Sequence, residues 1–281
     1  MKDKDIMHLL QAKKREAEEK SGYHISLMVL KGSQNYNCAD ENSDIDAVAF
    51  FVPTLEQLID GKIVSKKLTM NDGAFIELKD IRLFTNLMAK ANPSYLELLY
   101  SPYRIIDGNK SNEITAFINA MFSMRNEISV MNLTGFYKTI KGTSYQRYKS
   151  FLKSLDNDQG YNRKSFYQIY RMYLLAELTI KEGNSYEAAM CPGDIDSRYQ
   201  ECLMHYKNDI MCSEKAVAYA SLYHEKTTEM IDIHLSNNDF EFNLDTYANL
   251  QLLINKIVEF SIRLDMMKTG TSVKRKEAEA M

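Results

Sequence analysis

Two aspartates, Asp44 and Asp46, begin an apolar run in the segment SDIDAVAFFV, Ser43 to Val52. If this run is a β-strand, side chains alternate between its two faces, so both carboxylates point the same way. Their Cβ atoms then lie roughly 7 Å apart, close enough to share a divalent cation. Carboxylate oxygens suit Mg²⁺ or Mn²⁺, which keep several waters and also bind substrate phosphates. We therefore predict a catalytic metal site at Asp44 and Asp46.

A Gly-Ser pair, Gly32 and Ser33, closely follows a second apolar run, ISLMVL, Ile25 to Leu30. Glycine lets the backbone approach a ligand closely, and the start of a following helix offers free N–H groups to an anion. The hydroxyl of Ser33 adds a polar group. If the two apolar runs are neighbouring strands, a phosphate-binding loop lies beside the carboxylate pair.

A third carboxylate, Glu77, lies on a further strand candidate, Gly73 to Lys79, three residues before Asp80. Three carboxylates can hold two ions roughly 3.5–4 Å apart, which clamp the attacking and the leaving oxygen. Glu77 is alternatively a general base that takes the proton from an incoming hydroxyl. We predict Glu77 as the third catalytic and metal-binding residue of the set.

The tripeptide Asp-Ile-Asp occurs a second time, at Asp194 to Asp196, and there we predict a structural role. This copy follows Cys-Pro-Gly and precedes a helical pattern that starts near Ser197. Asp194 then serves as a helix N-cap and Asp196 as an acidic residue of the first turn. The first copy has a structural alternative too, because Gly-Ser and Asp-x-Asp both occur in ordinary turns. Unpaired like charges at the head of an apolar strand, however, are hard to explain by stability.

The remaining pattern predicts an α+β fold in two parts. The first hundred or so residues alternate between strand and helix patterns, whereas the chain after Asp107 shows almost only helical periodicity. Predicted strands cover 24–30, 44–52 and 73–79, and the clearest predicted helices cover 1–20, 53–61, 162–184, 213–235 and 245–265. We expect an α/β domain at 1–108, a helical domain at 109–268 and a flexible tail at 269–281.

Composition limits the function classes. The chain has 281 residues and a formal net charge of −3, so it is not a basic nucleic-acid binder as a whole, although a local basic face is allowed. The longest apolar runs are too short to span a bilayer, and the N-terminus does not read as a secretory signal. The 4 cysteines are too sparse for a disulfide framework. These features predict a cytoplasmic protein with free thiols and no membrane partner.

The segment LKGSQNYNCADENSDIDAVAFF resembles the Gly-Ser and Asp-x-Asp motif of the DNA polymerase β-like nucleotidyltransferase superfamily. With KDIRLFTNLMAKANPSYLELLYSP, it is similar to a subfamily of predicted bacterial and phage nucleotidyltransferases, some of which are found beside RNA ligases. The resemblance spans roughly residues 25 to 107, and the helical half matches mainly through NRKSFYQIYRMYLL. It implies a polymerase β-like domain with a small mixed sheet, followed by an all-α domain.

The resemblance also implies a reaction: an acceptor hydroxyl attacks the α-phosphate of an NTP, ATP among the candidates, and pyrophosphate leaves. Gly32 and Ser33 are then expected to hold the nucleotide phosphates, and Asp44 and Asp46 to bind Mg²⁺ or Mn²⁺. The third carboxylate position falls on Glu77, although many relatives have aspartate on that strand.

One face of the predicted helix 162–184 carries Lys164, Tyr167, Gln168 and Arg171. The resemblance favours a role for this face in closing the site, with Lys164 and Arg171 binding the triphosphate. A solvated helix face is the alternative. The basic and aromatic segment Phe136 to Ser150 is open to two interpretations as well, a base-stacking surface or a mixed helix surface.

Two other function classes remain open. A non-catalytic, antitoxin-like regulatory protein would keep the fold, and its role would survive substitution of Asp44 or Asp46. A metal-dependent phosphohydrolase would break down NTP without labelling an acceptor. For the transferase itself, the sequence leaves the NTP, the oligomeric state and the acceptor open; an RNA 3′ end, a protein hydroxyl and a small molecule are the candidate acceptors.

Overall fold

A five-stranded mixed sheet forms the N-terminal part of the protein, in the order β3-β4-β2-β1-β5. The computed structural model describes residues 3–39, 43–108, 111–155, 160–190, 192–208 and 211–279. The strands are β1 (Ile25–Lys31), β2 (Asp46–Phe51), β3 (Ser65–Thr69), β4 (Phe75–Asp80) and β5 (Arg104–Ile106). β2 runs antiparallel to β1 and parallel to β4. The three predicted strands are thus the three inner ones, and the two edge strands are additional.

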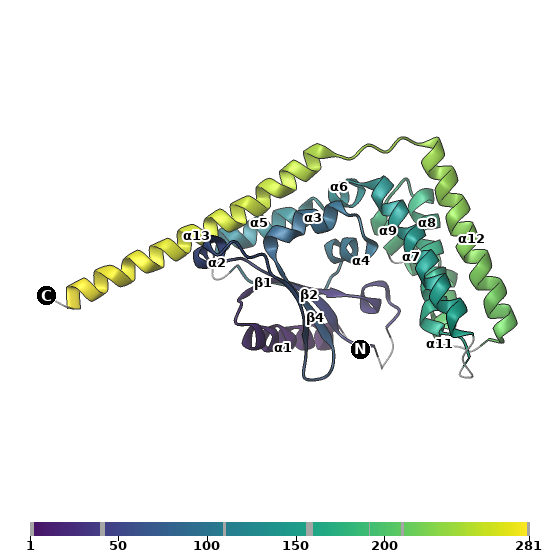
Figure 1. The fold of residues 1–281 in the computed structure, drawn as a ribbon, viewed down its shortest axis with the longest axis horizontal. Coiled ribbons are helices and arrows are strands. Elements are labelled where there is room, and N and C mark those ends of the chain that lie inside the picture. The colour runs from purple at the N-terminus through teal and green to yellow at the C-terminus, as the bar shows by residue number, and fades with distance from the viewer. Residues whose placement is uncertain are drawn as a thin grey trace.

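Helix α1 (Asp3–Ser21) covers one face of the sheet (Figure 1). Its apolar side chains Ile6 and Leu10 pack with those that alternate onto this face of the inner strands, such as Ala49 and Leu78. Strand alternation therefore builds a closed core on this side, because every second residue of β2 and β4 points toward α1.

The opposite face of the sheet packs against helices from distant parts of the sequence. They are α3 (Phe84–Ala89), α5 (Asn112–Ser123) and the long α13 (Leu244–Glu279), which lies across α5 and continues beyond it (Figure 1). Val48 and Phe50 of β2 share one buried cluster with residues of these helices. The sheet and the last helix therefore depend on each other for burial of apolar surface.

A group of helices lies beside the sheet and faces the end at which β1 stops and β2 begins (Figure 1). Helix α8 (Arg163–Lys181) packs against α7 (Leu133–Ser154), α11 (Ser197–Asn208) and α12 (Ser213–Asn237). The remaining helical segments are short: α2 (Leu55–Ile59), α4 (Pro93–Leu96), α6 (Arg125–Val130), α9 (Tyr186–Met190), α10 (Pro192–Ile195), and the 3-10 turns η1 (Ser33–Tyr36), η2 (Ile81–Leu83) and η3 (Glu97–Leu99). This arrangement confirms the predicted α+β fold with a helical C-terminal part.

The buried core is continuous across residue 108, and the division into two domains at that residue stays a prediction. One buried cluster joins Val29 of β1 to Ile118 of α5, Ile140 of α7 and Ile254 of α13. The backbone of 269–279 continues α13, where the sequence predicts a flexible tail. A helical backbone does not by itself show whether a segment is mobile. The flexibility of this tail therefore stays a prediction.

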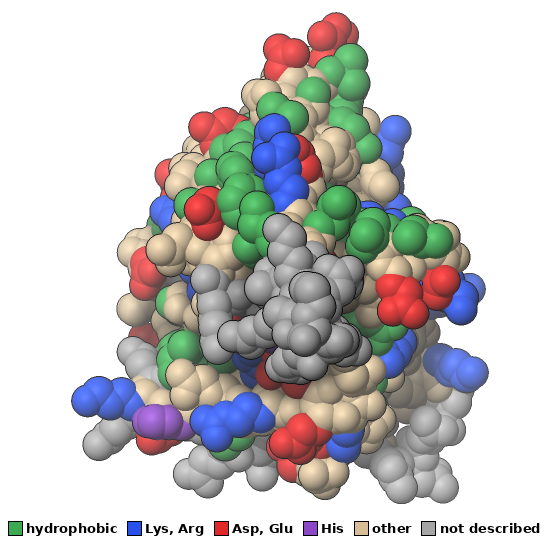
Figure 2. Space-filling view, turned by 90° about the vertical axis from the view of Figure 1, so that its left-hand side faces the viewer, with side chains coloured by type: hydrophobic (Ala, Val, Ile, Leu, Met, Phe, Trp, Pro, Cys, Tyr) green, Lys and Arg blue, Asp and Glu red, His purple; other side chains and the backbone are tan. Residues whose placement is uncertain are grey.

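The surface at the end to which α13 projects is chemically mixed. Figure 2 shows acidic and basic side chains side by side there, among hydrophobic ones. Among the described helices, none combines the length and the apolar character needed to cross a bilayer. A concentration of one type of charge is found instead in a cavity between the sheet and the helices.

Candidate active site

A polar cavity of about 900 Å³ lies between the end of the sheet and helices α7, α8 and α11. Five basic and two acidic side chains line it, in a chain whose formal net charge is −3. The lining residues are Lys31, Gly32, Ser33, Gln34, Tyr36, Ser43, Asp44, Asp46, Ser94, Arg147, Arg163, Lys164, Tyr167, Gln168, Lys207 and Asn208. A concave site with this charge balance attracts polyanions such as triphosphates.

The two aspartates of the first Asp-x-Asp copy both line this cavity. Asp46 is the first residue of β2, and its Oδ1 accepts a hydrogen bond from the backbone N–H of Phe75 at 3.2 Å. Asp44 precedes the strand and is exposed. Among the described residues, no side chain forms a hydrogen bond or ion pair with the Asp44 carboxylate. The pair therefore offers carboxylate oxygens to a cation in the cavity.

Glu77 lies on the same face of the sheet as Asp46 but does not line the cavity. Parallel pairing places Glu77 beside Val48, two residues beyond Asp46 along β2. The Oε1 atom of Glu77 lies 2.7 Å from Nζ of Lys31, which itself lines the cavity. Glu77, the third carboxylate predicted from the sequence, thus lies close to the Asp-x-Asp pair in the sheet. Lys31 lies on its cavity side.

The other oxygen of Glu77 is also engaged. Oε2 lies 3.2 Å from Nζ of Lys79 and accepts a hydrogen bond from the hydroxyl of Tyr95 at 2.7 Å. Burial by itself raises the pKa of Glu77, but the hydrogen bonds and charge of Lys31, with Tyr95 and Lys79, lower it to about 2. Glu77 is therefore a firmly ionised carboxylate, and one that binds a proton weakly in these contacts.

The residues present fit one hard cation better than a preformed two-ion site. In the described part of the chain, no group of three or more His, Cys, Asp or Glu side chains is arranged to hold a metal ion. Asp44 and Asp46 supply two carboxylates, and Mg²⁺ is usually bound by one or two carboxylates together with substrate phosphates and waters. Glu77 would join this set only if Lys31 exchanged its contact for another anion.

Gly32 has a backbone conformation that favours glycine, with φ 105° and ψ −154°. A Cβ atom added there would meet no other atom within 4 Å, so the requirement comes from the backbone and not from crowding. Gly32 donates its N–H to Oε1 of the buried Glu97 at 2.8 Å. Ser33 follows as the first residue of η1, and both residues line the cavity.

Helix α8 contributes Lys164, Tyr167 and Gln168 to the cavity, but not Arg171. The Arg171 side chain is only 13% exposed. Its guanidinium carbon lies 3.7 Å from the ring centroid of Tyr36, and its Nη2 lies 3.4 Å from Oε2 of Glu97. The structure therefore brings one of the two predicted phosphate-binding residues of this helix to the cavity and buries the other beneath the loop.

Four further basic residues of the lining were not among the predicted site residues: Lys31, Arg147, Arg163 and Lys207. Lys31 directly precedes Gly32, and Arg147 belongs to the basic and aromatic segment Phe136 to Ser150, so the sequence held a signal for both. Lys207 comes from α11, and no local pattern connects it with the Gly-Ser loop. Only the folded chain brings these groups together.

The second Asp-Ile-Asp copy is structural, with one correction to the prediction. Asp196, rather than Asp194, caps the following helix: its Oδ1 accepts the N–H of Arg198 at 2.9 Å. Asp194 instead belongs to the short helix α10, which ends at Ile195. The break between α10 and α11 therefore moves the cap two residues along the chain.

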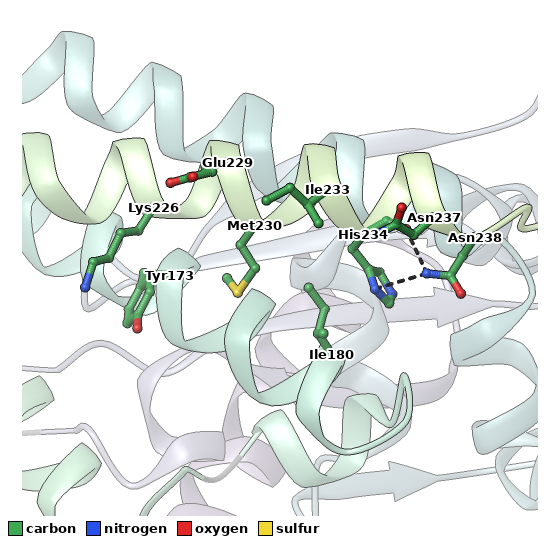
Figure 3. A pocket seen from close by; sticks show the side chains of 9 residues that line it. All are labelled: Tyr173, Ile180, Lys226, Glu229, Met230, Ile233, His234, Asn237 and Asn238. Atoms are coloured by element: carbon green, nitrogen blue, oxygen red, sulfur yellow. Dashed lines mark hydrogen bonds between the residues drawn. The ribbon is translucent and has the colours of Figure 1, made fainter.

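A second hollow, of about 400 Å³, lies between α8 and α12. Figure 3 shows Ile180 of α8 and Met230 and Ile233 of α12 among its lining side chains. Within the described residues, Glu229 is the one acidic side chain that lines it. Its mainly apolar lining suits an apolar group better than a triphosphate.

A Gly-Ser loop after β1 and an Asp-x-Asp pair at the start of the neighbouring strand β2 together line one basic cavity. The chain belongs to the RNA repair pathway DNA polymerase beta family (RlaP), whose model matches residues 2–184. It is also similar to the crystal structure of a nucleotidyltransferase-like protein from Exiguobacterium sibiricum 255-15, with 11% identity, 92% of each chain covered and a TM-score of 0.32. Among curated proteins, no sequence matches this chain.

Proposed function

We propose that the protein transfers a nucleoside monophosphate from an NTP to an acceptor hydroxyl, with Asp44 and Asp46 binding the Mg²⁺ or Mn²⁺ that the reaction needs. One observation carries the proposal: Gly32, Ser33, Asp44 and Asp46 line one cavity whose other charged lining residues are basic. A triphosphate needs both a loop that its oxygens can approach and cations around it.

In the proposed reaction, the acceptor oxygen forms a bond to the α-phosphorus, the bond from that phosphorus to the bridging oxygen breaks, and pyrophosphate leaves. Gly32 and Ser33 hold the phosphates, and Lys164 and Arg147 offset their charge from the helical side. When bound, the divalent cation neutralises charge that develops on the phosphate oxygens. The hydroxyl proton passes to a carboxylate or to water. Positioning and charge neutralisation supply most of the rate enhancement.

Lys31 and Glu77 have linked roles in this proposal. Lys31 lines the cavity and also contacts Glu77 at 2.7 Å, so a bound triphosphate competes with Glu77 for its ammonium group. Glu77 then either keeps Lys31 aimed at the phosphates or, once Lys31 moves, becomes the third carboxylate of the site. The first role keeps the contact between Lys31 and Glu77, and the second role breaks it.

An RNA end is the acceptor that we propose. The family is described as belonging to an RNA repair pathway. Arg147 of α7 and Arg163 of α8 add positive charge on the helical side of the cavity, where an acceptor with its own phosphates could lie. A protein hydroxyl or a small molecule remains an outcome of the test below.

The proposal is tested by incubating the protein with each α-labelled NTP, Mg²⁺ or Mn²⁺, and a pool of small RNAs and proteins. We expect label on RNA, and a loss of about a hundredfold or more in the Asp44→Asn/Asp46→Asn variant. The matched control is Asp194→Asn/Asp196→Asn, which alters the same tripeptide outside the cavity. Asparagine caps helices as well as aspartate does, so this control should keep its activity.

Each other outcome has a distinct meaning. Label released as free nucleotide, with no labelled acceptor, would indicate a phosphohydrolase. Label on a protein would keep the transferase and change the acceptor. If no NTP is consumed, and a partner binds equally well to the wild type and the Asp44→Asn/Asp46→Asn variant, the non-catalytic regulatory protein is the better reading.

A further inference from the structure

A buried acidic residue, Glu97, lies directly beneath the phosphate-binding loop. It begins the turn η3 and is 2% exposed. One carboxylate oxygen accepts the N–H of Gly32 at 2.8 Å, and the other lies 3.4 Å from Nη2 of Arg171. Glu97 therefore connects the backbone of the loop to a side chain of helix α8.

Arg171 also contacts the other end of the same loop. Its guanidinium lies over the ring of Tyr36, the last residue of η1, at 3.7 Å from the centroid. A planar guanidinium can stack on an aromatic ring and pair with a carboxylate at once, which a lysine ammonium cannot do. Arg171 thus holds both Gly32, through Glu97, and Tyr36 directly.

This arrangement is costly if stability is its only purpose. Two charges are removed from water, and apolar replacements of such a pair are often neutral or stabilising. The loop also contains Gly32 in a conformation that side-chain-bearing residues rarely adopt. An ion pair with a large desolvation penalty, which fixes an unusual loop conformation, is expected where the loop must hold a ligand.

Helix α8 carries both functions. Lys164, Tyr167 and Gln168 line the cavity, and Arg171 follows one turn later beneath the loop. We propose that Arg171 and Glu97 are a positioning pair that presents Gly32, Ser33 and Tyr36 to the nucleotide phosphates, so that the helical part of the protein sets the shape of the loop. This inference rests on the proposed function, and it assigns Arg171 a role without direct nucleotide contact.

The test compares stability with nucleotide affinity. The variant Glu97→Met/Arg171→Met removes both buried charges and releases Gly32 and Tyr36. We expect its urea unfolding midpoint to stay near that of the wild type, because neither charge is left unpaired. Its affinity for an α,β-methylene NTP with Mg²⁺, measured by calorimetry, should fall about tenfold, since the loop loses charge-assisted contacts.

Two further variants keep the test decisive if the double variant folds poorly. Arg171→Lys keeps the charge but loses the stacked, planar contact, so we expect weaker binding with nearly unchanged stability. Arg82→Met breaks the ion pair between Arg82 and buried Asp80, outside the cavity lining. It should lower the unfolding midpoint without changing the affinity.

The outcomes separate this inference from the proposed function. Wild-type affinity in the folded double variant and in Arg171→Lys would overturn the positioning pair and leave the transferase intact. The positioning pair would also be overturned if affinity fell only in proportion to stability. In that case Arg82→Met would lose as much affinity as the loop variants do. If the wild type does not bind the NTP analogue at all, both the proposed function and this inference fail.

Discussion

The carboxylate of Glu77 lies between the ammonium groups of Lys31 and Lys79, at 2.7 and 3.2 Å, and accepts the hydroxyl of Tyr95. These contacts are made with the ionised form, which is why the pKa falls from 4.5 to about 2 despite partial burial. Since the pKa is lower in the folded state than in the unfolded chain, Glu77 stabilises the fold above about pH 4.5. That contribution is lost as the pH falls through about 2.

Glu77→Gln should therefore lower the free energy of unfolding at pH 7 by on the order of 2–3 kcal/mol, and by much less near pH 2. The measurement is urea unfolding of the metal-free protein at several pH values between 7 and 2. Glu187→Gln, which breaks an exposed ion pair with Arg125, should change stability by less than about 1 kcal/mol at every pH. Equal losses at pH 7 and pH 2 would contradict the account of Glu77.

Gly32 is the residue of the candidate site at which the backbone conformation most clearly restricts the residue type. Gly32→Ala places a Cβ on a backbone with φ 105° and should cost about 1–3 kcal/mol in unfolding free energy, although there is open space around it. The helical Gly142 also has open space, without a positive φ, so Gly142→Ala should stabilise by about 0.5–1 kcal/mol. Urea unfolding of both variants checks the contrast; a destabilised Gly142→Ala would remove its value as a control.

At the scale of the elements, the inner strands were predictable because their apolar runs end at charged or turn-forming residues. β3 has the sequence SKKLT, mostly exposed, and β5 has only three residues. Neither carries enough apolar periodicity to be recognised alone; each exists because an inner strand offers it backbone hydrogen bonds. Local sequence likewise decides which residues of the candidate site could be predicted. Asp44, Asp46, Gly32 and Ser33 belong to local motifs, whereas Lys207 and Glu97 come from other elements of the fold.

Helix α8 shows what the spacing of residues along a helix can predict and what it cannot. The spacing of Lys164, Tyr167, Gln168 and Arg171 places them on one side of the helix. It does not say how far along that side the cavity extends. Tyr36 of the loop lies over the guanidinium of Arg171, and this contact depends on tertiary packing that the helix sequence does not encode.

At the scale of the whole molecule, charge is unevenly distributed. Five basic side chains face one cavity, although the formal net charge is −3. Arg147 and Lys164 are exposed there and have no ion-pair or hydrogen-bond partner among the described residues. Their charges should therefore contribute through solvent, weakly and in a salt-dependent way.

Arg147→Gln and Lys164→Gln should each weaken binding of a triphosphate by about two- to fivefold at low salt, and by less at high salt. The control is Lys149→Gln, because Lys149 lies on the same helix as Arg147 but outside the cavity lining. Titration of an NTP analogue at two salt concentrations measures the effect. An equal loss in Lys149→Gln would mean that overall charge, and not the cavity, attracts the ligand.

Helix α13 has a consequence for the order in which the protein is made. Its residues Leu250, Ile254 and Ile257 are fully buried in the cluster that also holds Val48 and Phe50 of β2. During synthesis, the strand that carries Asp46 leaves the ribosome about two hundred residues before the helix that completes its apolar cover. A nascent chain that has reached only the sheet must keep that surface exposed, so early chains are the form most exposed to aggregation and to chaperone binding.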